Sequence, residues 1–227
     1  MTLDTEDLLN SILASLDRID YIKPSDIPNI DLYMDQVTTF MDSRLRSGAR
    51  NPGDDKVLTK TMINNYAKND LLPPPVKKKY SKEHVLLLIF IYYYKGVLSI
   101  TDIQTLLGPI TEHFFQNGEK FDLESIYQEV FNMEKGQIEV MKADVVEKFK
   151  LAEETFGEAP EEHQEFLRQF SFICLLSFDV YMKRLMIEKM VDGMREKMQE
   201  NKPGKSTKAD KAKADKVKAD KTDKVTK

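Results

Sequence analysis

Apolar residues recur at intervals of three and four positions along most of the chain, which is the spacing of one face of an α-helix. The segment 4–16 shows this pattern after a capping residue, Asp4 or Thr5, and the segment 31–45 repeats it. Two prolines within 23–30 predict a loop between these two helices. The predicted apolar stripes are Leu8, Leu9, Ile12, Leu13 and Leu16, and then Met34, Val37, Phe40, Met41 and Leu45.

Two helices of opposite character are predicted in the middle of the chain. The first, over about 59–69, is polar and is capped by Thr59. The second begins after Ser81, runs to about Tyr94 and is almost entirely apolar. An apolar run of this kind is more typical of a core helix than of a surface for stacking nucleic-acid bases.

A short helix capped by Ser99 or Thr101 is predicted next. We expect it to stop at Gly108 and Pro109, because a proline inside a helix removes a hydrogen bond and clashes with the preceding turn. The residues from 111 to 201 continue the helical pattern to the end of the globular part.

The last helices are predicted from one weak point and one long apolar segment. Gly136 divides a stretch that is either one bent helix or two consecutive helices, and Pro160 opens a long final helix. Ten of the 13 residues in 170–182 are apolar, so this part of the helix has to be covered on nearly every side. It is therefore either the centre of a bundle or a dimer seam. Cys174 within it is interpreted as a small buried hydrophobe.

Charge is distributed unevenly, although the net charge is only −4. The segment 56–95 carries eight basic and two acidic side chains, whereas 96–201 carries 11 basic and 21 acidic ones. A basic segment in an acidic chain points to a local polyanion partner. The tail 202–227 repeats Ala-Asp-Lys and is predicted to be disordered, either as a solubilising tail or as a weak, salt-sensitive aid to polyanion binding.

The order of features in 58–107 resembles the DNA-binding domain of MerR-type bacterial regulators. A capped helix that ends near a Tyr is followed by "LLPP" at 71–74 and by a basic segment that closes with "YSKE" at 80–83. An apolar helix then leads into "LSITDIQTLL" at 98–107, the most specific part of the match. The whole chain also resembles an uncharacterised bacterial family built on this MerR-like domain.

The resemblance implies a mainly α protein with a winged helix-turn-helix domain at 31–110. An acidic helix and linker at 1–30 would precede it. A helical dimerisation or effector region at 111–201 and the disordered tail 202–227 would follow it. One departure from the MerR pattern lies at 64–66, where "NNY" stands in place of the usual Arg-Tyr-Tyr.

The resemblance also implies how the domain would bind DNA. The recognition helix, at about 59–69, would lie in the major groove, and its first turn is the end that usually enters the groove. The Lys-rich wing at 73–80 would contact phosphates, with its angle set by three consecutive prolines.

The residue types suit DNA independently of the resemblance. Lysine, hydroxyl and amide groups contact phosphates, and an Asn side chain can make a paired contact to adenine. The candidate DNA-binding residues are Lys56, Thr59, Lys60, Thr61, Asn64, Asn65, Tyr66, Lys68, Lys77, Lys78, Lys79 and Tyr80. Two alternatives stay open, since the Lys run alone would also suit a solvated loop and Tyr66 would also suit the core.

Other classes of function have no support in the sequence. The three His residues belong to no recognisable catalytic or metal-binding motif, and no Gly-rich phosphate loop is present. The acidic run 153–165 is more typical of a solvated turn than of a metal site. We therefore expect no catalysis, no cofactor and no metal. The acidic N-terminus, the short apolar runs and the single cysteine predict a soluble cytoplasmic protein with no membrane segment.

Two hypotheses follow from these features. The first is a transcriptional regulator that binds double-stranded DNA as a homodimer through its C-terminal helices, because two half-sites give usable affinity. The second is a protein-interaction module that keeps a MerR-like fold without sequence-specific DNA binding, which the "NNY" segment favours. The sequence leaves open the operator, the target genes, any small-molecule effector, and whether the protein activates or represses. It also leaves open whether the long apolar helix packs within one chain or across two.

Overall fold

The computed structural model describes residues 5–17, 22–46 and 57–200. It divides into two compact units, residues 1–188 and 189–227, which are described separately below. The candidate residue Lys56 and the tail predicted to be disordered lie outside the described residues.

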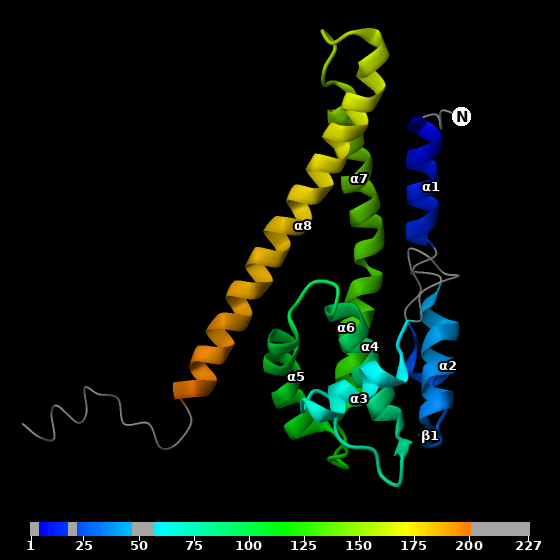
Figure 1. Cartoon of the computed structure of the whole chain (residues 1–227), viewed down its shortest axis with the longest axis vertical. Helices are drawn as coiled ribbons and strands as arrows, with labels where there is room; N and C mark the ends of the chain where they lie inside the picture. Colours follow the sequence, from blue (N-terminus) through cyan, green and yellow to red (C-terminus); the bar gives the residue numbers. More distant parts are fainter. Residues whose placement is uncertain (1–4, 18–21, 47–56, 201–227) are drawn as a thin grey trace, which may run out of the picture. The chain divides into compact units, whose positions relative to one another are not determined.

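The described chain is mainly helical, as the sequence predicts (Figure 1). One short two-stranded antiparallel sheet joins β1 and β2. The elements are α1 (Thr5–Asp17), a 3-10 turn (Pro24–Asp26), β1 (Leu32–Tyr33), α2 (Met34–Leu45), α3 (Lys60–Lys68), β2 (Lys79–Tyr80), α4 (Lys82–Tyr94), α5 (Ile100–Phe114), α6 (Leu123–Lys135), α7 (Gln137–Glu153) and α8 (Glu161–Glu200).

The larger core of the first unit is built around α4. Every residue from His84 to Ile91 is buried, because α5, α6 and β2 all pack against this helix. Phe90 at its centre meets Tyr127 and Phe131 of α6 at ring distances of 5.4 and 5.9 Å. A helix that is apolar all round is thus enclosed, as its sequence requires. The apolar core reading of this helix is confirmed.

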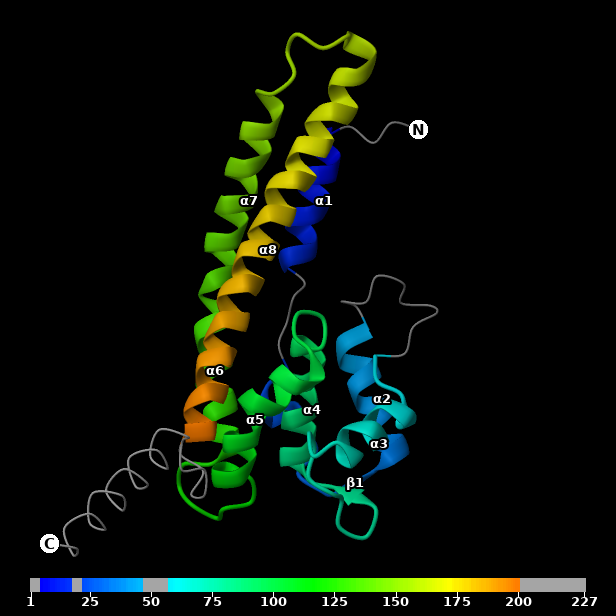
Figure 2. The same cartoon turned by 60° about the vertical axis from the view of Figure 1, so that its left-hand side comes forward.

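A second, smaller core lies where α1 and the first part of α8 pack against α7 (Figures 1 and 2). Phe149 of α7 and Phe172 of α8 meet edge to face at 5.5 Å. The apolar stripe of α1 covers them from the side, through Leu9, Ile12, Leu13 and Leu16. The predicted division at Gly136 is confirmed, since α6 ends before it and α7 begins after it.

The predicted helix at 31–45 is wrong at its first three residues. Leu32 and Tyr33 form β1 instead, where they pair with Tyr80 and Lys79 of β2. The pairing buries Leu32, and the backbone N–H of Tyr33 donates to the side chain of Gln36 at 2.8 Å. Strand pairing across a long sequence distance therefore overrides the local helical pattern.

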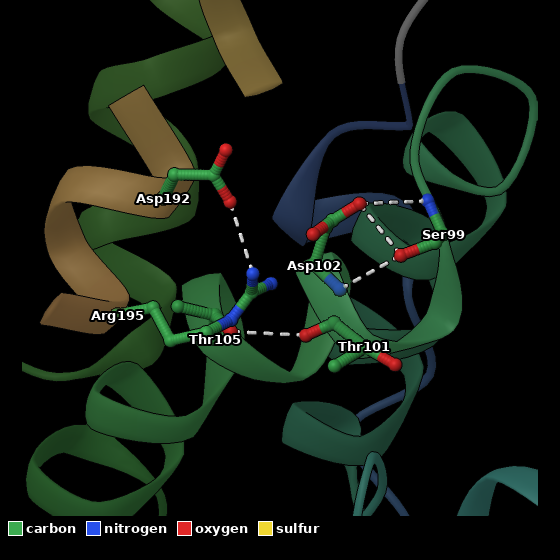
Figure 3. Close-up of polar contacts among 6 residues, drawn as sticks. All are labelled: Ser99, Thr101, Asp102, Thr105, Asp192 and Arg195. Carbon is green, nitrogen blue, oxygen red and sulfur yellow. Dashed lines mark hydrogen bonds and ion pairs between the residues drawn. The ribbon is translucent and has the colours of Figure 1, made fainter. Parts of the chain in front are cut away.

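The predicted stop at Gly108 and Pro109 is also wrong, because α5 continues through both residues to Phe114. The helix begins at a capping box in which Ser99 Oγ lies 2.6 Å from Asp102 Oδ2 (Figure 3). Leu107 before the proline is buried, and Ile110 after it packs on the same core. The packing of these two side chains on the core offsets the hydrogen bond that Pro109 removes.

The interpretation of Cys174 as a buried residue is wrong. Its side chain is exposed on α8, together with Phe170, Ile173 and Phe178. Only one face of α8 within the first unit packs against the smaller core, through Phe172, Leu175 and Leu176. The other apolar face is not covered by any described residue of that unit.

The second unit contains the last turns of α8. Arg195 and Asp192 form an ion pair within this helix at 3.0 Å (Figure 3). Such a pair at a spacing of three residues supports an exposed helix by a few tenths of a kcal/mol, roughly 0.2–0.5.

Candidate nucleic-acid interface

Helix α3 presents a polar face to solvent. Thr59 caps it, because its hydroxyl oxygen accepts the backbone N–H of Met62 at 3.2 Å. Ile63 and Tyr66 turn into the core on the opposite side. The exposed face is made of Lys60, Thr61, Asn64, Asn65 and Lys68.

Tyr66 has to be removed from the candidate DNA-binding residues. Its side chain is only 7% exposed and packs in the larger core. Burial raises the pKa of its hydroxyl above the ordinary value of 10.0. Its core-facing alternative is therefore the correct one.

The basic segment after the prolines forms a tight hairpin turn. Lys79 donates its backbone N–H to the carbonyl of Val76 at 3.0 Å, and Lys77 and Lys78 occupy the two central positions. Both central residues have positive φ, at 50° and 64°, as in a type I′ turn. The left-handed conformation costs non-glycine residues roughly 1 kcal/mol or more each. The turn therefore holds two exposed lysines in a strained conformation at its tip.

The hairpin is held to the rest of the domain through β2. Tyr80 is only 3% exposed, so its placement among the DNA-contacting residues is a second correction. Lys79 lies beside β1, with its Nζ 5.2 Å from the centre of the Tyr33 ring. Tyr33, which the sequence placed in a helix, is 53% exposed and adds an aromatic side chain to this surface.

The start of α3 and the hairpin meet at the junction of β1 and α2. Lys60 forms an ion pair with Asp35 in the first turn of α2, two residues beyond Tyr33. Because Tyr33 contacts Lys79, the β1–α2 junction links the two basic elements. Figures 1 and 2 both show α3, β1 and the hairpin next to one another. We call the exposed face of α3 together with Lys77, Lys78, Lys79 and Tyr33 the basic surface.

The lysines of the basic surface differ in their pairing. Among the described residues, Lys68, Lys77 and Lys78 have no acidic partner within ion-pair distance, whereas Lys60 is paired with Asp35. Unpaired surface lysines need no bond to be broken before they contact an anion. The hairpin tip is therefore the part of this surface most ready to bind one.

His84 is a buried polar residue at the base of the hairpin that the sequence did not single out. Its Nδ1 accepts the backbone N–H of Ser81 at 3.0 Å, and Ser81 Oγ lies 2.8 Å from the same atom. Its ring meets Tyr80 and Phe115 edge to face at 5.5 and 4.8 Å. Its Nε2 is buried with no hydrogen-bond partner among the described residues. The imidazole thus caps α4 in its neutral form.

Burial lowers the pKa of His84 below its ordinary value of 6.5. The backbone carbonyls of Pro74 and Pro73 and the charge of Asp31 act in the opposite direction with smaller effect. Protonation would also convert Nδ1 from an acceptor to a donor and break its bond with the Ser81 N–H.

We expect the stability of the protein to fall as the pH drops below 6.5. The unfolded chain then binds a proton at His84 that the folded chain does not, so the free energy of unfolding decreases until the lowered folded pKa is reached. Above this window His84 contributes no pH dependence. Urea unfolding at a series of pH values measures the effect.

His84→Asn is the matched control, because its Oδ1 can accept the Ser81 N–H but does not titrate. This variant should lose the decrease in the free energy of unfolding below pH 6.5 that is attributed to His84. Glu83 is a neighbouring titratable group, and burial raises its pKa, so its effect has the opposite sign. It is present in both proteins and cancels in the comparison. Equal pH profiles for the two proteins would contradict the assignment.

The described residues, 5–17, 22–46 and 57–200, contain neither a candidate metal cluster nor a candidate membrane span. Within these residues no group of three or more His, Cys, Asp or Glu side chains is placed to hold a metal ion. None of the helices in this part of the chain is both long enough and apolar enough to cross a bilayer.

One part of this chain matches a known protein family model. Residues 22–130 match the family model of a domain of unknown function (DUF1836). The match covers just under half of the chain. It includes the whole basic surface and the larger core around α4 except Phe131, and it leaves out α1, α7 and α8. Comparison with curated proteins gave no match, and comparison with solved structures gave none either.

Proposed function

We propose that the protein is a non-catalytic, DNA-binding transcriptional regulator of the winged helix-turn-helix type. The observation that carries the proposal is the hairpin tip, where two lysines without an acidic partner among the described residues are held at positive φ beside the polar face of α3. Strained backbone persists where surrounding structure or function maintains it. A basic tip beside a polar helix suits phosphate contact by the tip and groove reading by the helix.

In this proposal α3 reads the major groove and the hairpin contacts the backbone. Lys60 and Thr61 lie in the first turn of α3, and Asn64 and Asn65 follow one turn later on the exposed face. An Asn side chain can donate to and accept from adenine at the same time, so Asn64 and Asn65 are the base-reading residues. Lys68, Lys77 and Lys78 supply phosphate contacts, which fix the position of the protein on the duplex.

The uncovered face of α8 supports a homodimer as the DNA-binding form. At about 100° per residue, Phe170 and Tyr181 lie on the opposite side of the helix from the residues that pack in the smaller core. The exposed apolar side chains on or beside this face include Phe166, Phe170, Phe178 and Tyr181, each more than half exposed. Contiguous exposed patches of several hundred Å² mark protein interfaces. A second copy of the chain would offer the same apolar stripe.

A salt series tests the proposal. The protein should bind mixed genomic DNA fragments, and its affinity should fall by at least about a hundredfold between roughly 50 and 200 mM salt if four or more phosphates are contacted. Fluorescence anisotropy with labelled fragments measures it, and Lys183→Ala on α8, which removes one lysine far along the sequence, serves as the control. Failure to bind at about 50 mM salt would rule the proposal out.

The ion pair between Lys60 and Asp35 favours the second candidate, a protein-interaction module. It neutralises the lysine at the start of α3, where a DNA reader needs positive charge. Asp35→Asn separates the two functions, because it frees Lys60 for phosphate. In a DNA reader this change should raise affinity a few-fold, whereas an interaction module should show no DNA binding in either form.

A further inference from the structure

The smaller core of the first unit contains an apolar pocket of about 260 Å³ between α1, α7 and α8. Phe149 and Phe172 form its aromatic wall, the small side chain of Ala152 lines it from α7, and Ile12 lines it from α1. Protein interiors rarely leave voids larger than a water molecule. An engineered apolar cavity of about 150 Å³ holds one benzene molecule, so this pocket has room for a somewhat longer apolar group.

One cation lies among the apolar side chains that line the pocket. Arg168 is partly buried, and its hydrogen-bond partners among the described residues are both neutral, the carbonyl of Thr155 at 3.4 Å and Oε1 of Gln164 at 3.3 Å. Among the described residues it has no carboxylate partner. A guanidinium forks toward a carboxylate with two parallel hydrogen bonds, which neither neutral partner provides.

Glu153 lines the same pocket from α7 and could instead hold a cation. It forms no ion pair with Arg168 among the described residues, so either side chain is available to bind the charged group of a ligand in this pocket. Arg168 is favoured because two hydrogen bonds, to the loop before α8 and to its own helix, fix its guanidinium in place. No contact of this kind is seen for Glu153 in the described part of the chain.

We propose that this pocket binds a small amphipathic carboxylate, with its apolar chain between Phe149 and Phe172 and its carboxylate on Arg168. The size of the pocket fits a medium-length alkyl or an arylalkyl acid. Because α1 forms one wall, the ligand would also tie α1 to α7 and α8. This site is separate from the basic surface, so the inference does not rest on DNA binding.

Three probes of equal chain length test the proposal in the full-length protein. Octanoate, octanol and octylamine share the same apolar body and differ only in the head group. Isothermal titration calorimetry below micellar concentrations should show octanoate binding at least about tenfold tighter than octanol, as a charge-assisted hydrogen bond provides. Equal binding of octanoate and octanol, or tightest binding of octylamine, would overturn the assignment to Arg168. No binding of any probe would overturn the site itself.

Two variants locate the site. Arg168→Gln should remove the preference for octanoate over octanol, and the matched control Arg184→Gln on the same helix, where Arg184 pairs with Glu188, should keep it. Ala152→Leu fills the pocket and should abolish binding of octanoate and octanol alike without touching Arg168. If Ala152→Leu binds octanoate as the natural protein does, the ligand lies elsewhere. Failure of these tests would leave DNA binding unchanged, so the two proposals can fail separately.

Discussion

Replacing Lys77 by Asn and Lys78 by Gly should weaken DNA binding by about 10- to 100-fold at about 0.1 M salt without unfolding the protein. The logarithm of the DNA-binding constant falls with the logarithm of the salt concentration, and each phosphate contact adds about 0.9 to the steepness of that fall. Loss of two contacts therefore weakens binding by an amount within this range at about 0.1 M salt. Asn-Gly is the preferred sequence of a type I′ turn, the geometry that Lys77 and Lys78 adopt at positive φ. The variant should therefore keep the hairpin and relieve its strain.

Two measurements distinguish the loss of the two lysine charges from a change in the conformation of the hairpin. The slope of affinity against salt concentration should become shallower by about two in the Asn-Gly variant, and urea unfolding should show equal or higher stability. Lys77→Arg with Lys78→Arg keeps both charges and should bind as the natural protein does. If the Asn-Gly variant binds DNA with unchanged affinity and slope, the hairpin tip does not contact phosphate.

The conformation of this hairpin tip could not be predicted from the sequence. The run of three lysines contains no Gly or Asn to indicate positive φ, so the sequence showed a basic segment but not its strained turn. The turn follows from β2 pairing with β1 and from Val76 bridging to Lys79. Such pairing depends on residues more than 40 positions apart, which local propensity does not contain.

Helices with a strong local pattern were predictable. The cap at Thr59, the buried α4 and the break at Gly136 each follow from neighbouring residues, and the structure confirms them. Errors arose where packing opposes propensity. Pro109 stays inside α5 because Leu107 and Ile110 on either side of it pack on the larger core, and Leu32 leaves α2 because it pairs with Tyr80.

Individual side chains of the candidate site were harder to place than helices. Tyr66 and Tyr80 carry hydroxyl groups that suit phosphate contact, yet both are buried. The sequence does indicate that Tyr66 is buried, since Tyr66 follows the apolar residue Ile63 by three positions and therefore lies on the same face of α3. For His84 the only local signal is its position three residues after Ser81, the spacing of a capping box, since the contact of its ring with Phe115 forms only in the folded chain.

Replacing Phe170 and Phe178 by Asp should convert the protein from a dimer to a monomer at micromolar concentrations. The two rings are 52% and 62% exposed on the uncovered face of α8. Covering a half-exposed ring contributes roughly 1.5 kcal/mol, so four rings in a symmetric dimer contribute about 6 kcal/mol, or about a ten-thousandfold in the dissociation constant. Sedimentation equilibrium over a range of protein concentrations measures the shift.

The same substitutions should leave the fold intact, because neither ring packs in the smaller core. Phe121→Asp is the matched control, since Phe121 is equally exposed, at 56%, but lies outside α8. A natural protein that sediments as a monomer would contradict the homodimer. If the α8 variant is monomeric and also binds DNA more weakly, two half-sites contribute to affinity. This result is expected, because one small DNA-reading domain alone buries too little surface for tight binding. Unchanged DNA affinity in a monomeric variant would instead mean that one basic surface is sufficient.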